Sequence, residues 1–349
     1  MIHLVSALAA SLKENILESD LTIYDEIKVG DPNYWIPSNE LEELLSEQLV
    51  GLDLDGLALR TRSKLVKEEV CKGLGYDAPK SFKKTQPRFL CQNFDVYTQK
   101  SNNLQIWNEE ISPARRYVLI RISDEDIITK VRVVTGDILS ELDKTGTLTQ
   151  KYQAKLVGIA EKVKQFSESD TVEMKRLTDE FQGFASNTSP SAYPNSGEIM
   201  PIDEVFQRLQ SIVGMRFPYL GALQERNRGG VLHSQVCSAL GYSSFKDDGK
   251  FPDVKHQLIE VKLQTSPTID LGLFLPNNEE ALDIPLVNGQ SICMCDVRYA
   301  IFYGEVENDE VVITKFYLVT GNDFFEYFTQ FGGKKINKKL QIPLPNNFL

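Results

Sequence analysis

The sequence predicts an α/β protein made of two related copies of one unit, each a mixed central sheet flanked by helices. Three observations lead to this expectation. Segments with apolar residues at every third or fourth position precede segments in which apolar and polar residues alternate, the patterns of helices and strands. The two halves of the chain show these segments in the same order, and matching residues recur at nearly constant intervals.

Two helices are expected ahead of the strands in the first half. Ser38 or Asn39 can cap a helix that runs to Leu49 with its leucines on one face. A second helix is expected over about 59–74, and Gly75 is suited to end it. Strands are then expected near 90–98, over 117–122 and over 127–135, with a further helix starting at 136.

The second half repeats this order at an interval of 166 residues, so that Val236-Cys237 and Leu240-Gly241-Tyr242 match Val70-Cys71 and Leu74-Gly75-Tyr76. Further along, at an interval of 165 residues, three positions agree. They are Pro87 with Pro252, Asp95 with Glu260, and Gln99 with Gln264. Chance similarity between two helix–strand patterns is the alternative to duplication.

The expected domains are a first copy over 1–150, a connector over 151–197 and a second copy over 198–349. Lys151–Phe166 has the apolar spacing of an amphipathic helix, and another helix is expected over Thr171–Phe181. Ser186–Gly197 has the composition of a flexible linker. The segment Lys334–Leu349 is basic and then proline-rich, so an extended tail or edge segment is expected there.

Composition narrows the classes of protein that the chain can belong to. With 349 residues, 42% of them hydrophobic, the chain can bury a large core. There is no apolar run of membrane-spanning length and no basic, cleavable leader, so a cytoplasmic protein that does not enter a membrane is expected. The net charge of −11 argues against a general nucleic-acid binder but not against an enzyme with one basic groove.

The stretch Phe251–Gln264 carries the chemistry. Read as a strand, it points Glu260, Lys262 and Gln264 to one face, and three apolar side chains to the other. Asp253 lies just upstream, behind a proline. Two carboxylates and an ammonium group at one end of a buried strand can hold a divalent metal and a water against a phosphate.

This Pro-Asp … Glu-Val-Lys pattern resembles the PD-(D/E)XK nuclease superfamily, which includes many type II restriction endonucleases. The resemblance implies a restriction-endonuclease-like fold and Mg²⁺-dependent hydrolysis that leaves a 5′-phosphate. Asp253 and Glu260 would bind Mg²⁺, with the carbonyl of Val261 as a further ligand, and Lys262 would orient the attacking water. Gln264 would extend the motif, and Glu225 would be the extra acidic residue of a preceding helix.

The first copy lacks these charges. At an interval of 165 residues, Arg88 corresponds to Asp253, and Tyr97 corresponds to Lys262. The first copy is therefore expected to serve recognition or subunit contact. Basic residues that could contact DNA phosphates occur in both halves. They are Lys80, Lys83, Lys84 and Arg88, and the cluster Arg226, Asn227 and Arg228. One active site per chain cuts one strand, so cleavage of double-stranded DNA implies a homodimer.

The favoured function is thus that of a sequence-specific type II DNA endonuclease. A structure-specific or repair nuclease with the same core is the alternative within enzymes, and a non-catalytic DNA-binding protein is the alternative outside them. For the motif itself, the plain alternative is an exposed strand face with salt-bridged charges. The three histidines are scattered, and no nucleotide-binding loop of the form GxxxxGK[ST] is present.

Overall fold

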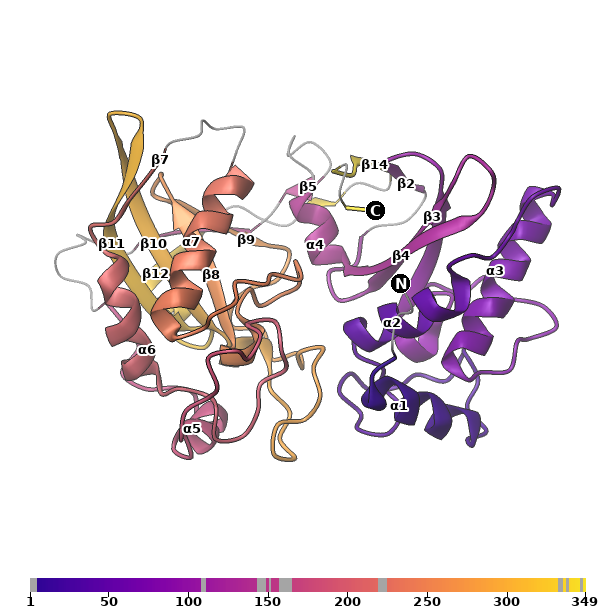
Figure 1. The fold of residues 1–349 in the computed structure, drawn as a ribbon, viewed down its shortest axis with the longest axis horizontal. Helices are drawn as coiled ribbons and strands as arrows, with labels where there is room; N and C mark the ends of the chain where they lie inside the picture. Colours follow the sequence, from indigo (N-terminus) through magenta and orange to yellow (C-terminus); the bar gives the residue numbers. More distant parts are fainter. Residues whose placement is uncertain are drawn as a thin grey trace. The chain divides into compact units, whose positions relative to one another are not determined.

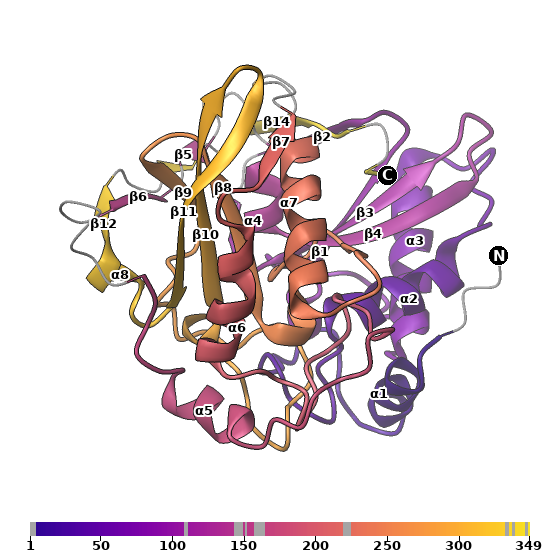
Figure 2. The same cartoon turned by 60° about the vertical axis from the view of Figure 1, so that its left-hand side comes forward.

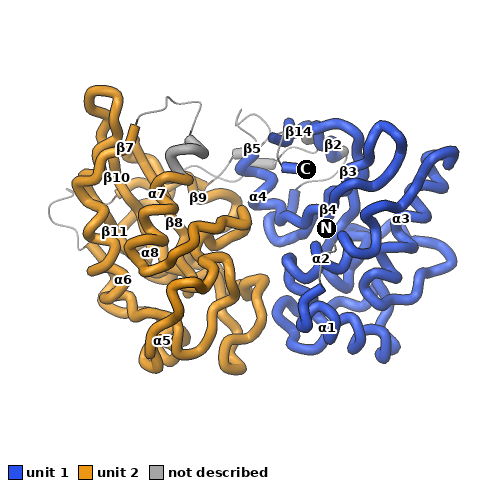
Figure 3. Tube along the Cα trace, viewed as in Figure 1, with its two compact units in different colours: residues 1–151, 334–349 blue, residues 152–333 orange. Residues whose placement is uncertain are grey.

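A computed structural model describes residues 5–107, 111–142, 149–150, 152–156, 165–218, 225–331, 335–336, 339–345 and 348–349. Within these ranges, the side chains of residues 107, 149–150, 225–229, 335–336 and 339–340 are not described. The fold is mixed α/β, with several small sheets and helices (Figure 1). The chain forms two compact units (Figure 3). Unit 1 is Met1–Lys151 with Lys334–Leu349, and unit 2 is Tyr152–Gly333.

Two helices of unit 1, α2 (Ser38–Leu49) and α3 (Leu59–Leu74), lie where the leucine and valine spacing predicts them. A further helix, α1 (Ala7–Leu17), precedes them. The Ser6 hydroxyl caps α1 by accepting the Ala9 N–H at 3.1 Å. Gly75 ends α3 in the left-handed region, at φ 87°, and a Cβ there would lie 2.6 Å from the Lys13 carbonyl oxygen. A glycine is therefore required where α3 passes α1.

A three-stranded sheet forms the centre of unit 1, in the order β1-β3-β4. Its strands are β1 (Phe94–Gln99), β3 (Arg116–Ile122) and β4 (Ile128–Thr135). β1 runs parallel to β3 with Phe94 opposite Arg116, and β3 runs antiparallel to β4. The short helix α4 (Gly136–Glu141) follows β4. The apolar faces of α1, α2 and α3 pack with this sheet into one core.

The end of the chain returns to unit 1. β14 (Lys339–Pro343) pairs with β2 (Asn103–Trp107), and β13 (Lys335–Ile336) pairs with β5 (Thr149–Gln150). The sequence placed residues 334–349 in the second domain and residues 151–197 in a connector. In the structure, residues 334–349 belong to unit 1, and unit 2 begins at residue 152. Strand pairing between distant segments leaves no local pattern in the sequence that would reveal it.

Unit 2 contains a four-stranded sheet in the order β7-β11-β10-β8. The strands are β7 (Arg216–Pro218), β8 (Ile259–Gln264), β10 (Arg298–Glu307) and β11 (Glu310–Thr320). β8 is an edge strand parallel to β10, with Ile259 opposite Arg298, and β10 and β11 are antiparallel. The helices α6 (Ile202–Leu209) and α7 (Glu225–Leu240) cover one face of this sheet (Figure 2).

Both faces of the first part of β10 are buried, because alternate side chains enter different cores. Ala300 and Phe302 pack with α6 and α7, while Tyr299 and Ile301 belong to a second core on the other face. A small sheet adds to that second core, in the order β12-β6-β9. Its strands are β12 (Phe328–Phe331), β6 (Tyr152–Leu156) and β9 (Thr268–Gly272). Unit 2 also contains the short helices α5 (Val172–Thr178) and α8 (Phe324–Tyr327).

The helix expected over Lys151–Phe166 is wrong for its first part, since Tyr152–Leu156 is the strand β6; residues 157–164 lie outside the described ones. β6 pairs with β9 and β12 on either side. A short apolar run can serve a strand as well as a helix, and the partners on both sides decide it. The helix expected from Thr171 is confirmed as α5.

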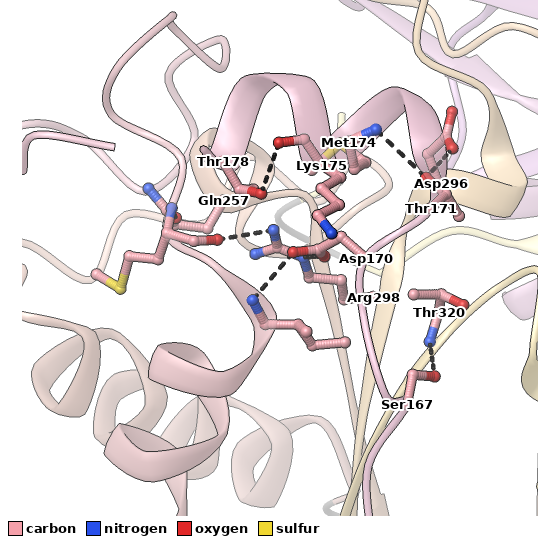
Figure 4. A network of polar contacts seen from close by, with 12 residues as sticks. Ser167, Asp170, Thr171, Met174, Lys175, Thr178, Gln257, Asp296, Arg298 and Thr320 are labelled. Carbon is pink, nitrogen blue, oxygen red and sulfur yellow. Dashed lines mark hydrogen bonds and ion pairs between the residues drawn. The ribbon is translucent and has the colours of Figure 1, made fainter. Parts of the chain in front are cut away.

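A buried ion pair connects the start of α6 to the start of β10. Arg298 is fully buried, and its Nε donates to Asp170 at 2.7 Å, while a second nitrogen donates to the Met200 carbonyl at 2.7 Å (Figure 4). The other Asp170 oxygen accepts the N–H of Ile202, the first residue of α6. Removing one partner of such a pair strands a charge in the core, so this contact fixes α6 relative to the strand next to β8.

Among the described residues, no helix is both long enough and apolar enough to cross a membrane.

Candidate active site

The chain doubles back immediately before β8, and this brings Asp253 over the strand. Val254 and Ile259 exchange backbone hydrogen bonds at 2.9 and 3.1 Å across a short 3₁₀ turn, Lys255–Gln257. Leu258 completes the reversal with a φ of 53°. Asp253 therefore reaches the middle of β8 although it lies seven and nine residues before Glu260 and Lys262 in the sequence.

Three of the expected catalytic side chains meet at this point. Asp253 Oδ2 accepts the backbone N–H of Val261 at 2.9 Å, and Glu260 Oε2 faces the backbone N–H of Asp253 at 3.3 Å. Lys262 Nζ lies 2.8 Å from Glu260 Oε1, as expected for residues on the same face of a strand. The arrangement is thus a carboxylate pair with one ammonium group beside it.

Burial and the proximity of the two acids determine the electrostatics of the site. The pKa of the Asp253 carboxyl is raised well above its usual value, first because burial disfavours its charged form and next because Glu260 carries the same charge. Lys262 and the N–H of Val261 act in the opposite direction. Glu260 and Lys262 have 8% and 21% of their side chains exposed, so the site is desolvated but open on the lysine side.

The backbone of β8 offers one more oxygen to this group. The carbonyl of Leu258 accepts the backbone N–H of Arg298 in β10. The backbone N–H and C=O groups of even-numbered residues in β8 therefore point towards β10, and those of Val261 point towards the open edge. Its N–H bonds Asp253 on that side, and its carbonyl points the same way because both groups of a strand residue share an edge. Val261 thus turns its oxygen towards the side on which Asp253 lies.

These oxygen atoms are suitable ligands for a magnesium ion. Mg²⁺ is usually held by one or two carboxylates, with waters and substrate phosphates completing its octahedron. Asp253, Glu260 and the Val261 carbonyl supply two carboxylates and one neutral oxygen. Within the described part of the chain, no three His, Cys, Asp or Glu side chains are grouped as a ready-made metal cluster.

The remaining predicted residues lie on β8, on α7 and on a loop of unit 1, and some of their side chains are not described. Gln264 is the last residue of β8, one pleat beyond Lys262, and it is partly buried. Glu225, Arg226, Asn227 and Arg228 form the first turn of α7, but their side chains lie outside the described ones. In unit 1, Lys80, Lys83 and Lys84 are exposed on the loop after α3, and Arg88 is partly buried at the end of that loop.

Two features beside the site were not predicted from the sequence. Asp247, on the loop before the motif, is close enough for its charge to raise the pKa of both Asp253 and His233. His233 Nε2 lies 3.4 Å from the Cys237 sulfur, one turn further along α7, and burial is the main reason why the pKa of His233 is lowered. The acidic pair at residues 247–248 was the only signal in the sequence, because the fold alone brings the loop and α7 to β8.

The comparisons with known proteins found no family model, no curated protein and no solved structure that matches this chain.

Proposed function

We propose that this protein is a Mg²⁺-dependent endonuclease that cuts double-stranded DNA at a specific sequence, as type II restriction enzymes do. The observation that carries the proposal is the convergence of Asp253, Glu260 and Lys262 beside β8. A salt-bridged surface strand would explain Glu260 and Lys262. It would not explain why a second, desolvated carboxylate is turned back onto the same strand.

The residue types suit hydrolysis of a phosphodiester. Asp253 and Glu260 would hold the metal, together with the carbonyl of Val261. A bound Mg²⁺ would polarise the scissile phosphate and lower the pKa of a bound water. Lys262 would orient that water by hydrogen bonding and offset the negative charge that develops on the phosphorus oxygens. Gln264 would steady the lysine from the next pleat, and the products would carry 5′-phosphates.

We also propose that the two units are copies of one ancestral restriction-endonuclease-like fold. The support is that residues at corresponding places make the same contacts. Arg116 and Arg298 are both buried, and each is the first residue of a strand that pairs in parallel with the preceding one. Arg116 donates to the carbonyl of Ile36, and Arg298 donates to that of Met200; a proline and a helix follow each of these carbonyls.

A second set of equivalent contacts supports the same proposal. Gln92 accepts the N–H of Ile36 at 3.0 Å, and Gln257 accepts that of Met200 at 2.9 Å. A 3₁₀ turn contains each glutamine, and the next residue, Asn93 or Leu258, has a positive φ. General helix–strand patterning does not require such side-chain agreement.

If the two units share one ancestor, only unit 2 has kept the residues proposed for cleavage. Asp95 keeps the place of Glu260, since it accepts the Arg88 N–H at 3.0 Å, but Arg88 and Tyr97 replace the aspartate and the lysine. One active site per chain then implies that two chains act together on a duplex. Unit 1 is free for recognition or subunit contact.

A nicking assay on supercoiled plasmid with Mg²⁺ tests the proposed activity. Lys262→Ala should lower the rate by about 10²–10³-fold, because it removes a group that stabilises the transition state. Lys315→Ala is the matched control, since Lys315 is an exposed lysine on β11 of the same sheet, and it should cut like the wild type. A wild-type protein that binds DNA but never nicks it would favour the alternative of a non-catalytic binding protein.

The form of the products separates the two enzyme alternatives. A site-specific enzyme should cut plasmid DNA into discrete fragments with uniform ends. Preference for a branched or damaged duplex over intact plasmid would instead favour a structure-specific or repair nuclease.

A further inference from the structure

Tyr303 of β10 carries a polar group that the fold buries and leaves without a partner. Its hydroxyl oxygen is buried, and no described residue forms a hydrogen bond with it. A buried hydroxyl without a partner costs free energy, and such groups are uncommon in folded proteins. Burial raises the pKa of Tyr303 to about 12, so the hydroxyl keeps its proton at neutral pH. It is therefore a neutral hydrogen-bonding group and not a base.

The neighbour of Tyr303 on β8 is Gln264, the last residue of the motif strand. The two residues are opposite each other in the register of the parallel strands, which lie about 4.8 Å apart. Their side chains share one face of the sheet. Tyr303 packs with the core on the face away from α6 and α7, and Gln264 points the same way, since Leu263 packs with the opposite core. Lys262 lies on that face too, one pleat before Gln264.

The neighbour of Tyr303 on the other side is turned to solvent. It is Lys315 of β11, and its side chain is exposed. The ring of Tyr303 is held by the ring of Tyr317, which packs edge-on with 6.0 Å between the ring centres. Tyr303 therefore offers its oxygen from a fixed position, and Gln264 is the cross-strand neighbour placed to reach it.

Gln264 has the two chemical groups that are needed to connect Tyr303 with Lys262. An ammonium group only donates hydrogen bonds, so a glutamine that contacts Lys262 must present its carbonyl oxygen to it. The amide NH₂ group of that glutamine then points away and needs an acceptor of its own. The oxygen of Tyr303 is such an acceptor.

The present partner of Lys262 is on the other side of the lysine along the strand. The ammonium nitrogen lies 2.8 Å from Glu260 Oε1. On the proposed function, Glu260 would be a metal ligand and would share its negative charge with the metal. Lys262 would then have hydrogen bonds to give to another acceptor. Gln264 is the next polar side chain on this face, about 6.6 Å further along the strand.

Unit 1 lacks this hydroxyl. The residue opposite Gln99 in the register of β1 and β3 is Arg121, and its guanidinium group donates to Asn102 at 3.0 Å. These two residues are the last pair of their ladder, as Gln264 and Tyr303 are in unit 2. The hydroxyl and the motif lysine are thus absent from unit 1 together.

We propose that Tyr303 is a positioning residue of the cleavage reaction: its oxygen accepts a hydrogen bond from the Gln264 amide, whose carbonyl oxygen accepts one from Lys262. The inference rests on the proposed function and deepens it by naming the group that orients Gln264. Tyr303 touches neither the phosphate nor the attacking water. It determines which end of the amide faces the lysine, and thereby where the lysine directs its remaining donors.

The first test compares rates of plasmid nicking with Mg²⁺. Tyr303→Phe removes only the hydroxyl, and it should lower kcat about tenfold while leaving the KM for DNA unchanged, because Tyr303 does not contact the substrate. In a Gln264→Leu background the same change should have no further effect, because the amide that it holds is gone. Tyr317→Phe is the matched control. It removes the hydroxyl of the adjacent ring and should cut like its parent in both backgrounds.

The second test does not depend on cleavage. Urea unfolding of the wild type, Tyr303→Phe, Gln264→Leu and the double variant measures how strongly the two positions are coupled. In EDTA, Tyr303→Phe should be at least as stable as the wild type, because it removes an unpaired buried hydroxyl. In Mg²⁺ both single variants should lose part of the stabilisation by the metal, and the double variant should lose no more than either.

Each result decides the proposal. It is overturned if Tyr303→Phe cuts like the wild type, if Tyr317→Phe loses the same rate, or if the effects of Tyr303→Phe and Gln264→Leu add. A clear loss of stability of Tyr303→Phe in EDTA also overturns it, because the hydroxyl would then have a structural partner.

The fate of the nuclease proposal is measured separately. A protein that nicks DNA equally well with and without the Tyr303 hydroxyl keeps the activity and loses the positioning role. If the protein never nicks DNA, the contact between Tyr303 and Gln264 stands when the coupling appears in Mg²⁺ and falls when it does not.

Discussion

Asp253 is a residue whose placement costs stability. Its carboxyl is desolvated and faces Glu260, and the compensating contacts come from Lys262 and from one backbone N–H. Such unfavourable electrostatics are typical of functional sites, where the fold holds charges ready for a ligand. A divalent cation would relieve this repulsion, which gives the residue a measurable signature.

That signature is a pH dependence of stability. The raised pKa means that the folded state keeps a proton that the unfolded chain has lost above about pH 4. In EDTA, the free energy of unfolding should therefore fall as pH rises from that value through the raised pKa. Asp253→Asn should remove this fall and should be more stable than the wild type at neutral pH.

Urea titrations at several pH values measure the effect, and repeating them with Mg²⁺ provides the control. Mg²⁺ should stabilise the wild type, because a ligand that binds only the folded state adds to its stability, and it should leave Asp253→Asn unchanged. An identical pH slope in the two proteins would contradict the assignment of the slope to Asp253.

At the scale of elements, β8 is supported by β10 and by the contacts that anchor β10. It pairs with β10, and the first residue of β10, Arg298, is anchored by Asp170 and by the backbone next to α6. This anchoring gives the edge strand a fixed support although only one of its sides carries a strand. The position of the site therefore depends on the β10 anchor as well as on the motif.

The anchor can be tested by substitution. Asp170→Ala should lower the free energy of unfolding by about 3–5 kcal/mol, because it leaves the Arg298 charge buried without its partner. The double variant Asp170→Leu/Arg298→Met should be much less destabilised, since it removes both charges. Denaturant unfolding measures both. A single and a double variant of equal stability would show that the loss comes from packing and not from the stranded charge.

The end of α3 offers a second test at this scale. Gly75→Ala should be destabilising by more than the roughly 1–2 kcal/mol that a left-handed alanine costs, because its Cβ would also press on the Lys13 carbonyl. Gly51→Ala is the control, with a φ of 91° and nothing within 4 Å of its added Cβ. Thermal unfolding of the two variants compares them, and equal losses would refute the close approach of α3 to α1.

At the scale of the whole molecule, function is divided between the units on our proposal. One unit would carry the cutting site and the other a binding surface, within a chain whose overall charge is −11. Concentrating cations at a few places lets such an acidic protein approach DNA in a defined orientation, because most of its surface repels the phosphates.

A homodimer makes a prediction about mixed subunits. If two chains cut the two strands of one site, adding an excess of Lys262→Ala protein to a limiting amount of wild type should convert the plasmid product from linear to nicked DNA. Each mixed dimer would have one working site. An unchanged share of linear product, measured on a gel, would mean that one chain cuts both strands by itself.

Much of the local structure could be predicted, and the reason lies in side-chain periodicity. The leucine spacing in α2, the valine spacing in α3 and the alternation in β8 each record which face of the element is buried. The same alternation places Glu260 and Lys262 on one side of the strand, where the structure has them in contact. Periodicity failed at β6, whose short apolar run fits a helix equally well.

The sequence by itself determined the local elements and the residue types of the candidate site, because each depends on neighbours a few positions away in the chain. Only the tertiary structure decided that Asp253 turns back over β8, that Asp170 neutralises Arg298 and that the last residues join unit 1 as β14. These contacts join segments far apart in the sequence. They form because burying a charge or an open strand edge is costly without a partner, and that partner is chosen by the fold.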